Sequence, residues 1–347
     1  MTSARIDRRK FASLALSPAL LAWSASRGQP KVEKTRITLA LGARASFQQL
    51  PLIIAQQLGY FKAEGLDVEL AEQVSDAAVA QAIAGGAADV ASGDFHQVLM
   101  LQASGQPAQC FALHGRAPMV VAGLSSRQFG KTAGLADLRG RRIGVPALGS
   151  TAHLVSDMLL RRVGLAAGEV THVPLGTAAA AMTALRAGQV DMLCAGDPLM
   201  TQLEQKGDIR VLADTRNLKG TGEVFGGPML SGCLFAATGF VRRNPGSAQA
   251  LANAMIHALK WLQTAGPSDL IRTVPDAYLL GDRALYLACF EKMREGIATD
   301  GLASIEGARL ALRVLAEFDP AMKRAQLNPA DCVNNEFARR AKDRYKL

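Results

Sequence analysis

The run Ala-Leu-Gly-Ser-Thr-Ala-His at 147–153 combines a glycine with two hydroxyl groups directly after a predicted strand at 143–145. The same run opens a predicted helix. The first backbone N–H groups of a helix lack an internal partner and carry partial positive charge. Gly149, Ser150 and Thr151 are therefore candidates for holding a carboxylate or sulfonate without a cationic side chain. The alternative is that Ser150 is only an N-cap, a role that it has in either case.

Two more residues join this candidate ligand site because of their helical positions. His153 lies within the first turn of the same helix, where it either reaches a ligand or faces the surface. Thr177 follows Gly176 at the start of the next predicted helix and repeats the arrangement of amide donors more weakly.

Polar side chains also follow other predicted strands. Ser46 and Gln48 come after the first strand, and the amide of Gln48 offers both a donor and an acceptor. Gly93 and Asp94 follow a short buried strand, where the glycine permits close backbone approach and the aspartate either caps a helix or accepts from a ligand. Asp197 presents the same two alternatives in the second half of the chain.

Strands and helices alternate along most of the chain, and this order predicts an α/β fold with parallel sheets covered on both faces. The expected strands lie at 37–41, 66–70, 88–91, 110–113, 119–124, 141–145, 171–175, 190–194 and 209–213. Ligands of such open sheets bind beyond the carboxyl ends of the strands. The polar residues above are all expected at that edge.

A short internal repeat indicates that the chain folds as two lobes. Ile-Ala-Gly-Gly-Ala-Ala-Asp-Val at 83–90 is repeated as Leu-Arg-Ala-Gly-Gln-Val-Asp-Met at 185–192. Each is a helix end, a glycine and a strand that opens with aspartate. We expect lobe one at 36–125 plus 230–347, with a helical tail, and lobe two at 126–225.

Composition excludes several classes of protein. Apolar residues make up 49% and charged residues 20%, which suits a packed core, and aromatics at 5% disfavour stacking on nucleic acid. The net charge of +9 arises mainly in residues 1–36, which contribute +6, so it does not indicate a nucleic-acid partner. The histidines show no metal-ligand spacing, and no nucleotide or nucleophile motif occurs. We therefore expect no metal, no cofactor and no catalytic residue.

Residues 1–26 have the pattern of an export signal: a basic start, an apolar run at 11–23, and small residues at 24–26. The apolar run is too short to span a bilayer. Asp-Arg-Arg-Lys-Phe at 7–11 resembles the twin-arginine signal, and an ordinary secretory signal is the alternative. We expect the mature protein, with this signal removed, to be periplasmic and not embedded in the membrane.

The five cysteines are widely spaced and show no paired motif. Buried free thiols are expected, with a single disulfide as the alternative. They stand at positions 110, 194, 233, 289 and 332.

Two segments resemble signatures of periplasmic substrate-binding proteins of the nitrate, sulfonate, taurine and thiamine-pyrimidine type. They are Leu-Gly-Tyr-Phe-Lys-Ala-Glu-Gly-Leu-Asp-Val at 58–68, and Leu-Arg-Gly-Arg-Arg-Ile-Gly-Val-Pro at 138–146 with Gly-Ser-Thr-Ala-His at 149–153. The resemblance covers about 36–320. It implies a type II periplasmic-binding-protein fold with two crossovers and a cleft. It also implies a monomeric receptor that delivers a small organic anion, a sulfonate or carboxylate, to an ABC permease and its ATPase.

Three alternatives stay open: a thiamine-pyrimidine precursor as the ligand, a synthase-like enzyme of the same fold, and a periplasmic ligand sensor. The eukaryotic-type synthase that the chain resembles carries a lysine after the strand at 88–91 and a cysteine cluster later. Here the loop at 92–95 reads Ser-Gly-Asp-Phe, and 231–236 contains one cysteine. These departures favour a binding protein over an enzyme.

Overall fold

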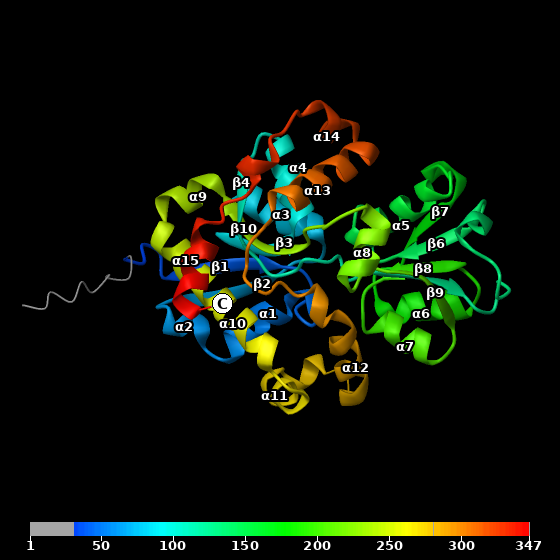
Figure 1. Ribbon diagram of the computed structural model, residues 1–347, viewed down its shortest axis with the longest axis horizontal. Coiled ribbons are helices and arrows are strands. Elements are labelled where there is room, and N and C mark those ends of the chain that lie inside the picture. The colour runs from blue at the N-terminus through cyan, green and yellow to red at the C-terminus, as the bar shows by residue number, and fades with distance from the viewer. Residues whose placement is uncertain (1–30, 280, 347) are drawn as a thin grey trace, which may run out of the picture.

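The computed structural model describes residues 31–279 and 281–346, which form two lobes, each around one five-stranded sheet (Figure 1). The predicted export signal at 1–26 lies outside these residues. Within them, no helix combines the length and apolar character needed to cross a membrane.

The first sheet has the strand order β2-β1-β3-β10-β4. Its strands are β1 (Arg36–Leu41), β2 (Asp67–Glu72), β3 (Val90–Asp94), β4 (Ala108–Leu113) and β10 (Gly232–Ala237). The helices between its early strands are α1 (Leu50–Gln57), α2 (Tyr60–Ala63), α3 (Asp76–Ala84) and α4 (Phe95–Ala103). Strands β1 and β3 are almost wholly buried because helices cover both faces.

The second sheet repeats this topology in the order β7-β6-β8-β5-β9. Its strands are β5 (Val121–Ser125), β6 (Arg142–Val145), β7 (Thr171–Pro174), β8 (Met192–Ala195) and β9 (Ile209–Asp214). Its helices are α5 (Thr151–Arg162), α6 (Ala178–Arg186), α7 (Leu199–Gln205) and α8 (Leu218–Phe225). The expected two-lobed α/β fold is confirmed.

Two details of the sheets differ from expectation. Each sheet holds one antiparallel strand, β5 or β10, where parallel sheets were expected. Residues 121–125, expected in lobe one, form β5 of the second sheet. The reason is the crossover: the chain leaves β4 and passes between the lobes at 114–120. Strand β5 therefore enters the second sheet from the other lobe and runs against its neighbours, and β10 does the reverse.

The C-terminal part is helical, as expected, and packs mainly on lobe one (Figure 1). It comprises α9 (Thr238–Arg243), α10 (Pro245–Thr264), α11 (Pro267–Thr273), α12 (Arg283–Met293), α13 (Ile305–Phe318), α14 (Pro320–Arg324) and α15 (Glu336–Tyr345). Short 3-10 turns lie at Phe47–Gln49, Leu135–Leu138, Ala167–Glu169, Asp276–Tyr278, Arg294–Gly296 and Pro329–Cys332. Helix α12 reaches α7 of lobe two, so the tail also touches the second lobe.

All five cysteines are buried free thiols, which confirms the first expectation for them. Burial raises the pKa of Cys194, Cys289 and Cys332 to about 12. At neutral pH these thiols are protonated and behave as small apolar side chains.

Candidate functional site

A cavity of about 390 Å³ lies between the two lobes, lined by residues of both. The carboxyl ends of β1 and β3 face it from lobe one, and those of β6 and β8 face it from lobe two. Eight of the ten residues singled out from the sequence line this cleft: Ser46, Gln48, Gly93, Asp94, Ser150, Thr151, Thr177 and Asp197. Most of the candidates therefore lie together at the carboxyl ends of the strands, where ligands of open α/β sheets bind.

Asp94 is the polar centre of the lobe-one wall. Its side chain is buried, and one carboxylate oxygen accepts from Gln48 Nε2 and, at 2.8 Å, from Ser231 Oγ. The other oxygen accepts from the hydroxyl of Thr151, which belongs to lobe two. Asp94 therefore ties the two lobes together across the cleft.

The first turn of α5 faces this carboxylate. Ser150 caps the helix: its Oγ accepts from the backbone N–H of His153 at 3.3 Å and donates to the carbonyl of Ala147 at 2.7 Å. The Ser150 hydroxyl thus both donates and accepts a hydrogen bond within lobe two. Thr177 caps α6 in the same way, accepting from Ala180 N at 3.2 Å.

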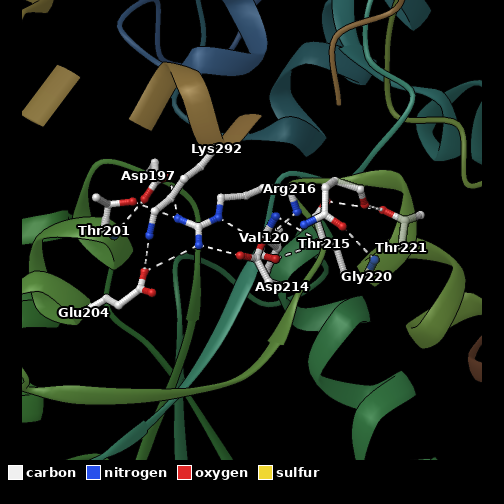
Figure 2. Close-up of polar contacts among 11 residues, drawn as sticks. Val120, Asp197, Thr201, Glu204, Asp214, Thr215, Arg216, Gly220, Thr221 and Lys292 are labelled. Carbon is white, nitrogen blue, oxygen red and sulfur yellow. Dashed lines mark hydrogen bonds and ion pairs between the residues drawn. The ribbon is translucent and has the colours of Figure 1, made fainter. Parts of the chain in front are cut away.

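Asp197 lines the cleft, but its carboxylate forms its hydrogen bonds with residues of lobe two (Figure 2). One oxygen accepts from Thr201 N at 2.8 Å, and the other pairs with Arg216 Nη1 at 3.0 Å. Both charged side chains are 1% exposed or less. The hydrogen bonds of Asp197 hold the loop after β8 in place, and this is the structural alternative that the sequence left open.

Gly149 and His153 do not line the cleft. Gly149 borders an adjoining cavity that shares Asp76 and Ser150 with the cleft, and its N–H donates to His153 Nδ1 at 2.9 Å. The imidazole of His153 packs edge-on against His172, with ring centroids 4.3 Å apart. Helix α5 turns this side chain toward β7 and away from the cleft lining, which is the second of the two orientations that the sequence left open for His153.

Asp76, the first residue of α3, also lines the cleft and was not among the residues predicted from the sequence. Burial raises the pKa of Asp76, the charge of Asp94 raises it further, and His96 partly opposes this. The signal was present, because Ser75 and Asp76 follow the carboxyl end of β2 as a cap and a first-turn acid.

The remaining lining is largely apolar, with Phe47, Met119 and Met293 among its side chains. None of the described lining residues is a lysine, an arginine or a histidine. The charged groups on the cleft wall are carboxylates. Among the described lining residues, only Asp197 has a carboxylate in direct contact with a cationic side chain, so the lobe-one side of the cleft is electronegative.

A buried histidine lies behind the lobe-one wall. His114 is 1% exposed, and its Nε2 lies 3.0 Å from Ser92 Oγ. Burial lowers its pKa from 6.5 to about 4, although the charge of Asp94 opposes the shift. The folded protein therefore keeps this imidazole neutral at pH values where the unfolded chain protonates it.

Stability should therefore depend on His114 below pH 6.5. Its contribution is complete above that pH and is lost as the pH falls from 6.5 to about 4, because only the unfolded state gains the proton. The expected slope is about 1.4 kcal/mol per pH unit for this group. Urea unfolding between pH 7.5 and 4.5, compared with His114→Gln, measures it. An identical slope in the variant would contradict this assignment.

Two lobes, two crossovers and a polar cleft between them define the fold of the substrate-binding proteins of ABC importers. Residues 46–265 match the family described as NMT1/THI5 like, and the chain belongs to this family. The chain is 45% identical to a solved protein from Bordetella bronchiseptica RB50. The alignment covers 91% of this chain and 100% of that one, with a TM-score of 0.85.

Two more distant solved structures share the fold. The alkanesulfonate-binding protein SsuA from Xanthomonas axonopodis pv. citri, bound to MOPS, is 19% identical over 88% of this chain and 100% of its own, with a TM-score of 0.67. The nitrate-binding protein NrtA from Synechocystis PCC 6803 is 16% identical over 90% and 89%, with a TM-score of 0.70.

A curated relative is the 4-amino-5-hydroxymethyl-2-methylpyrimidine phosphate synthase of Schizosaccharomyces pombe. It is 26% identical over 141 residues, which are 41% of this chain and 40% of the synthase. The match thus spans less than half of the synthase.

Proposed function

We propose that this protein is the solute-binding component of an ABC importer and captures one small organic molecule between its lobes. The observation that carries the proposal is the hydrogen bond between Asp94 of lobe one and Thr151 of lobe two at the cleft. A bond of this kind exists only when the lobes are closed. A solute that contacts both walls shifts the equilibrium toward the same closed state.

The chemistry of the cargo follows from the cleft wall. Asp94 and Asp76 present carboxylates to the cavity, while lysine, arginine and histidine are absent from its described lining. Such a wall favours a cargo that donates N–H or O–H groups and carries an apolar body. An aminopyrimidine of the kind named for the Schizosaccharomyces relative fits this description.

A sulfonate or carboxylate is the second candidate, supported by the first turns of α5 and α6 at the cleft. An anion at the start of α5 is disfavoured, because the carboxylate of Asp94 already contacts Thr151 there. An anion placed there would meet a like charge at short range. The solved relative that binds MOPS shows only that this fold accommodates such a ligand.

Export, delivery to a permease with its ATPase, and action as a monomer complete the proposal, and the export signal expected at 1–26 supports the first of these. A sensor would bind the same cargo but would not deliver it to a permease. Cargo-dependent stimulation of ATP hydrolysis, in vesicles that carry the permease and ATPase proposed as its partners, tests transport directly. A closed, loaded receptor that never stimulates it would favour sensing.

The interlobe bond can be tested with Thr151→Val, which removes the hydroxyl and keeps the shape. We expect about tenfold weaker cargo binding, because a hydrogen bond to a charged group is lost in the closed state alone (about 1.5 kcal/mol). Calorimetry with 4-amino-5-hydroxymethyl-2-methylpyrimidine and with MOPS gives the affinities. Thr151→Ser should restore binding, and Ser150→Ala, which removes only a cap, should mainly lower stability. Equal affinity in Thr151→Val would remove this bond from the closing mechanism.

A further inference from the structure

A second cluster of polar side chains lies in lobe two, away from the cleft lining. His153 and Asp157 are four residues apart on α5, and His172 is on the adjacent edge strand β7 (Figure 1). One ligand atom from each lies within 4.8 Å of the other two. Both histidine Nε2 atoms are 3.6 Å from a different oxygen of Asp157.

We propose that His153, Asp157 and His172 form a binding site for one divalent transition-metal ion, with Zn²⁺ as the best fit. Two imidazoles and one carboxylate are a donor set that zinc prefers, and three protein ligands leave one position for water. Ligand atoms on a tetrahedral ion with bonds of about 2.0–2.1 Å lie some 3.3–3.5 Å apart. The two 3.6 Å separations run to different oxygens of Asp157, and the three ligand atoms lie within 4.8 Å of one another, so the side chains must draw together by up to about 1.5 Å around an ion.

The surroundings of the cluster support this assignment. Oδ1 of Asp157 is buried and accepts no hydrogen bond in the described structure, although a buried carboxylate oxygen normally has a donor. A metal ion would provide that missing partner. The three side chains are 23%, 11% and 8% exposed for His153, Asp157 and His172, so the cluster is enclosed but reachable from solvent on the His153 side.

Two existing hydrogen bonds compete with the metal. Gly149 N donates to His153 Nδ1 at 2.9 Å, and Ser156 Oγ lies 3.0 Å from His172 Nε2. A metal on Nε2 of His153 needs a proton on Nδ1, so the bond from Gly149 must be given up. Metal binding is therefore expected to release the backbone amide that precedes the cap of α5, and to be weaker than in a closed structural zinc site.

The sequence pattern alone did not reveal this site, because its histidines are not paired on one element. His153 and Asp157 share a helix face at the i, i+4 spacing, but His172 joins them only through the packing of β7 against β6 and of α5 on the sheet. The edge position of β7 leaves one side of the cluster without a covering strand.

The test uses the mature chain without an affinity tag, stripped of metal by a chelator. Titration with Co²⁺ should give the visible absorption of a tetrahedral site at about one ion per chain, and Zn²⁺ should displace it. Asp157→Asn and His172→Gln should each weaken Zn²⁺ binding at least tenfold, while His257→Gln, a half-buried histidine of lobe one, should leave it unchanged. The melting temperature of each metal-free variant shows that it is folded.

If His172→Gln does not fold, His153→Gln carries the same test from the more exposed side of the cluster. Binding of the same strength in all of the variants would overturn the proposal, since the ion would then lie elsewhere. So would a Co²⁺ spectrum of octahedral type or no binding at all. Amide exchange at Gly149 should become faster in the presence of Zn²⁺, a result that a surface-bound ion would not produce.

Discussion

Replacement of Arg216 with methionine should lower the free energy of unfolding by about 3–5 kcal/mol, the range for removing one partner of a buried ion pair. Arg216 is 1% exposed and donates to Asp197 and Thr201 through Nη1, at 3.0 and 2.8 Å (Figure 2). Its Nε donates to Asp214 Oδ1 at 2.9 Å. Without the guanidinium, the fully buried carboxylate of Asp197 is left with no cation.

Arg216 stays protonated in the folded protein. Burial opposes it, but the hydrogen bonds and charges of Asp214 and Asp197 more than offset burial and raise the pKa of the guanidinium above its ordinary value. The cluster extends through Glu204 to Lys292 of α12, whose Nζ lies 2.6 Å from the carboxylate (Figure 2). It thereby joins lobe two to the helical tail of lobe one.

Urea unfolding of the cargo-free protein measures this effect. Lys219→Met is the matched control, because it removes a cation from α8 whose side chain is 87% exposed, and it should change stability little. Arg216→Lys should recover only part of the loss, because an ammonium cannot reproduce the planar fork of donors. A loss below about 1 kcal/mol in Arg216→Met would show that Asp197 finds other partners.

Replacement of Asp94 with asparagine should have the largest effect on cargo binding. The direction of the change in affinity distinguishes a cargo that donates hydrogen bonds from an anionic cargo. If the cargo donates to this carboxylate, affinity should fall by roughly 10- to 150-fold, corresponding to about 1.5–3 kcal/mol for a hydrogen bond to a charged group. If the cargo is an anion, affinity should be unchanged or higher, because the amide oxygen of the asparagine still accepts from Thr151 while the buried negative charge is removed. We expect the first result with the aminopyrimidine.

Calorimetry with the aminopyrimidine and with MOPS distinguishes these outcomes. Asp67→Asn is a control of equal charge, because Asp67 opens β2 at the end of the strand away from the cleft and its side chain is 72% exposed. It should leave both affinities unaltered. Tighter binding of MOPS to Asp94→Asn, with no binding of the aminopyrimidine to the parent protein, would replace the nitrogenous cargo by an organic anion.

Local signals were sufficient to locate most of the cleft. The helix caps at Ser150 and Thr177, and the strand before each, depend on neighbours within a few residues, so they can be read from the chain directly. The alternation of strands and helices then places both caps at one sheet edge. The same rule, applied to the carboxyl end of β2, also predicts a cleft position for Asp76.

The membership of β5 in the second sheet is not specified by its local sequence. Residues 121–125 have the composition of a buried strand, and nothing local states which sheet they join. The pairing with β8 and β9 depends on where the chain crosses between lobes, and the direction of the strand follows from that crossing.

The amino-acid sequence by itself determined the α/β architecture and the polar edge, because periodicity, capping and turn chemistry act over a few residues. Only the tertiary structure decided how the charges are used. It joined Asp94 to Thr151 across the lobes, committed Asp197 to Arg216, and turned His153 away from the cleft toward Asp157 and His172. These pairings depend on how two separately folded sheets meet and on which face of a helix packs inward, and no local pattern of residues specifies either.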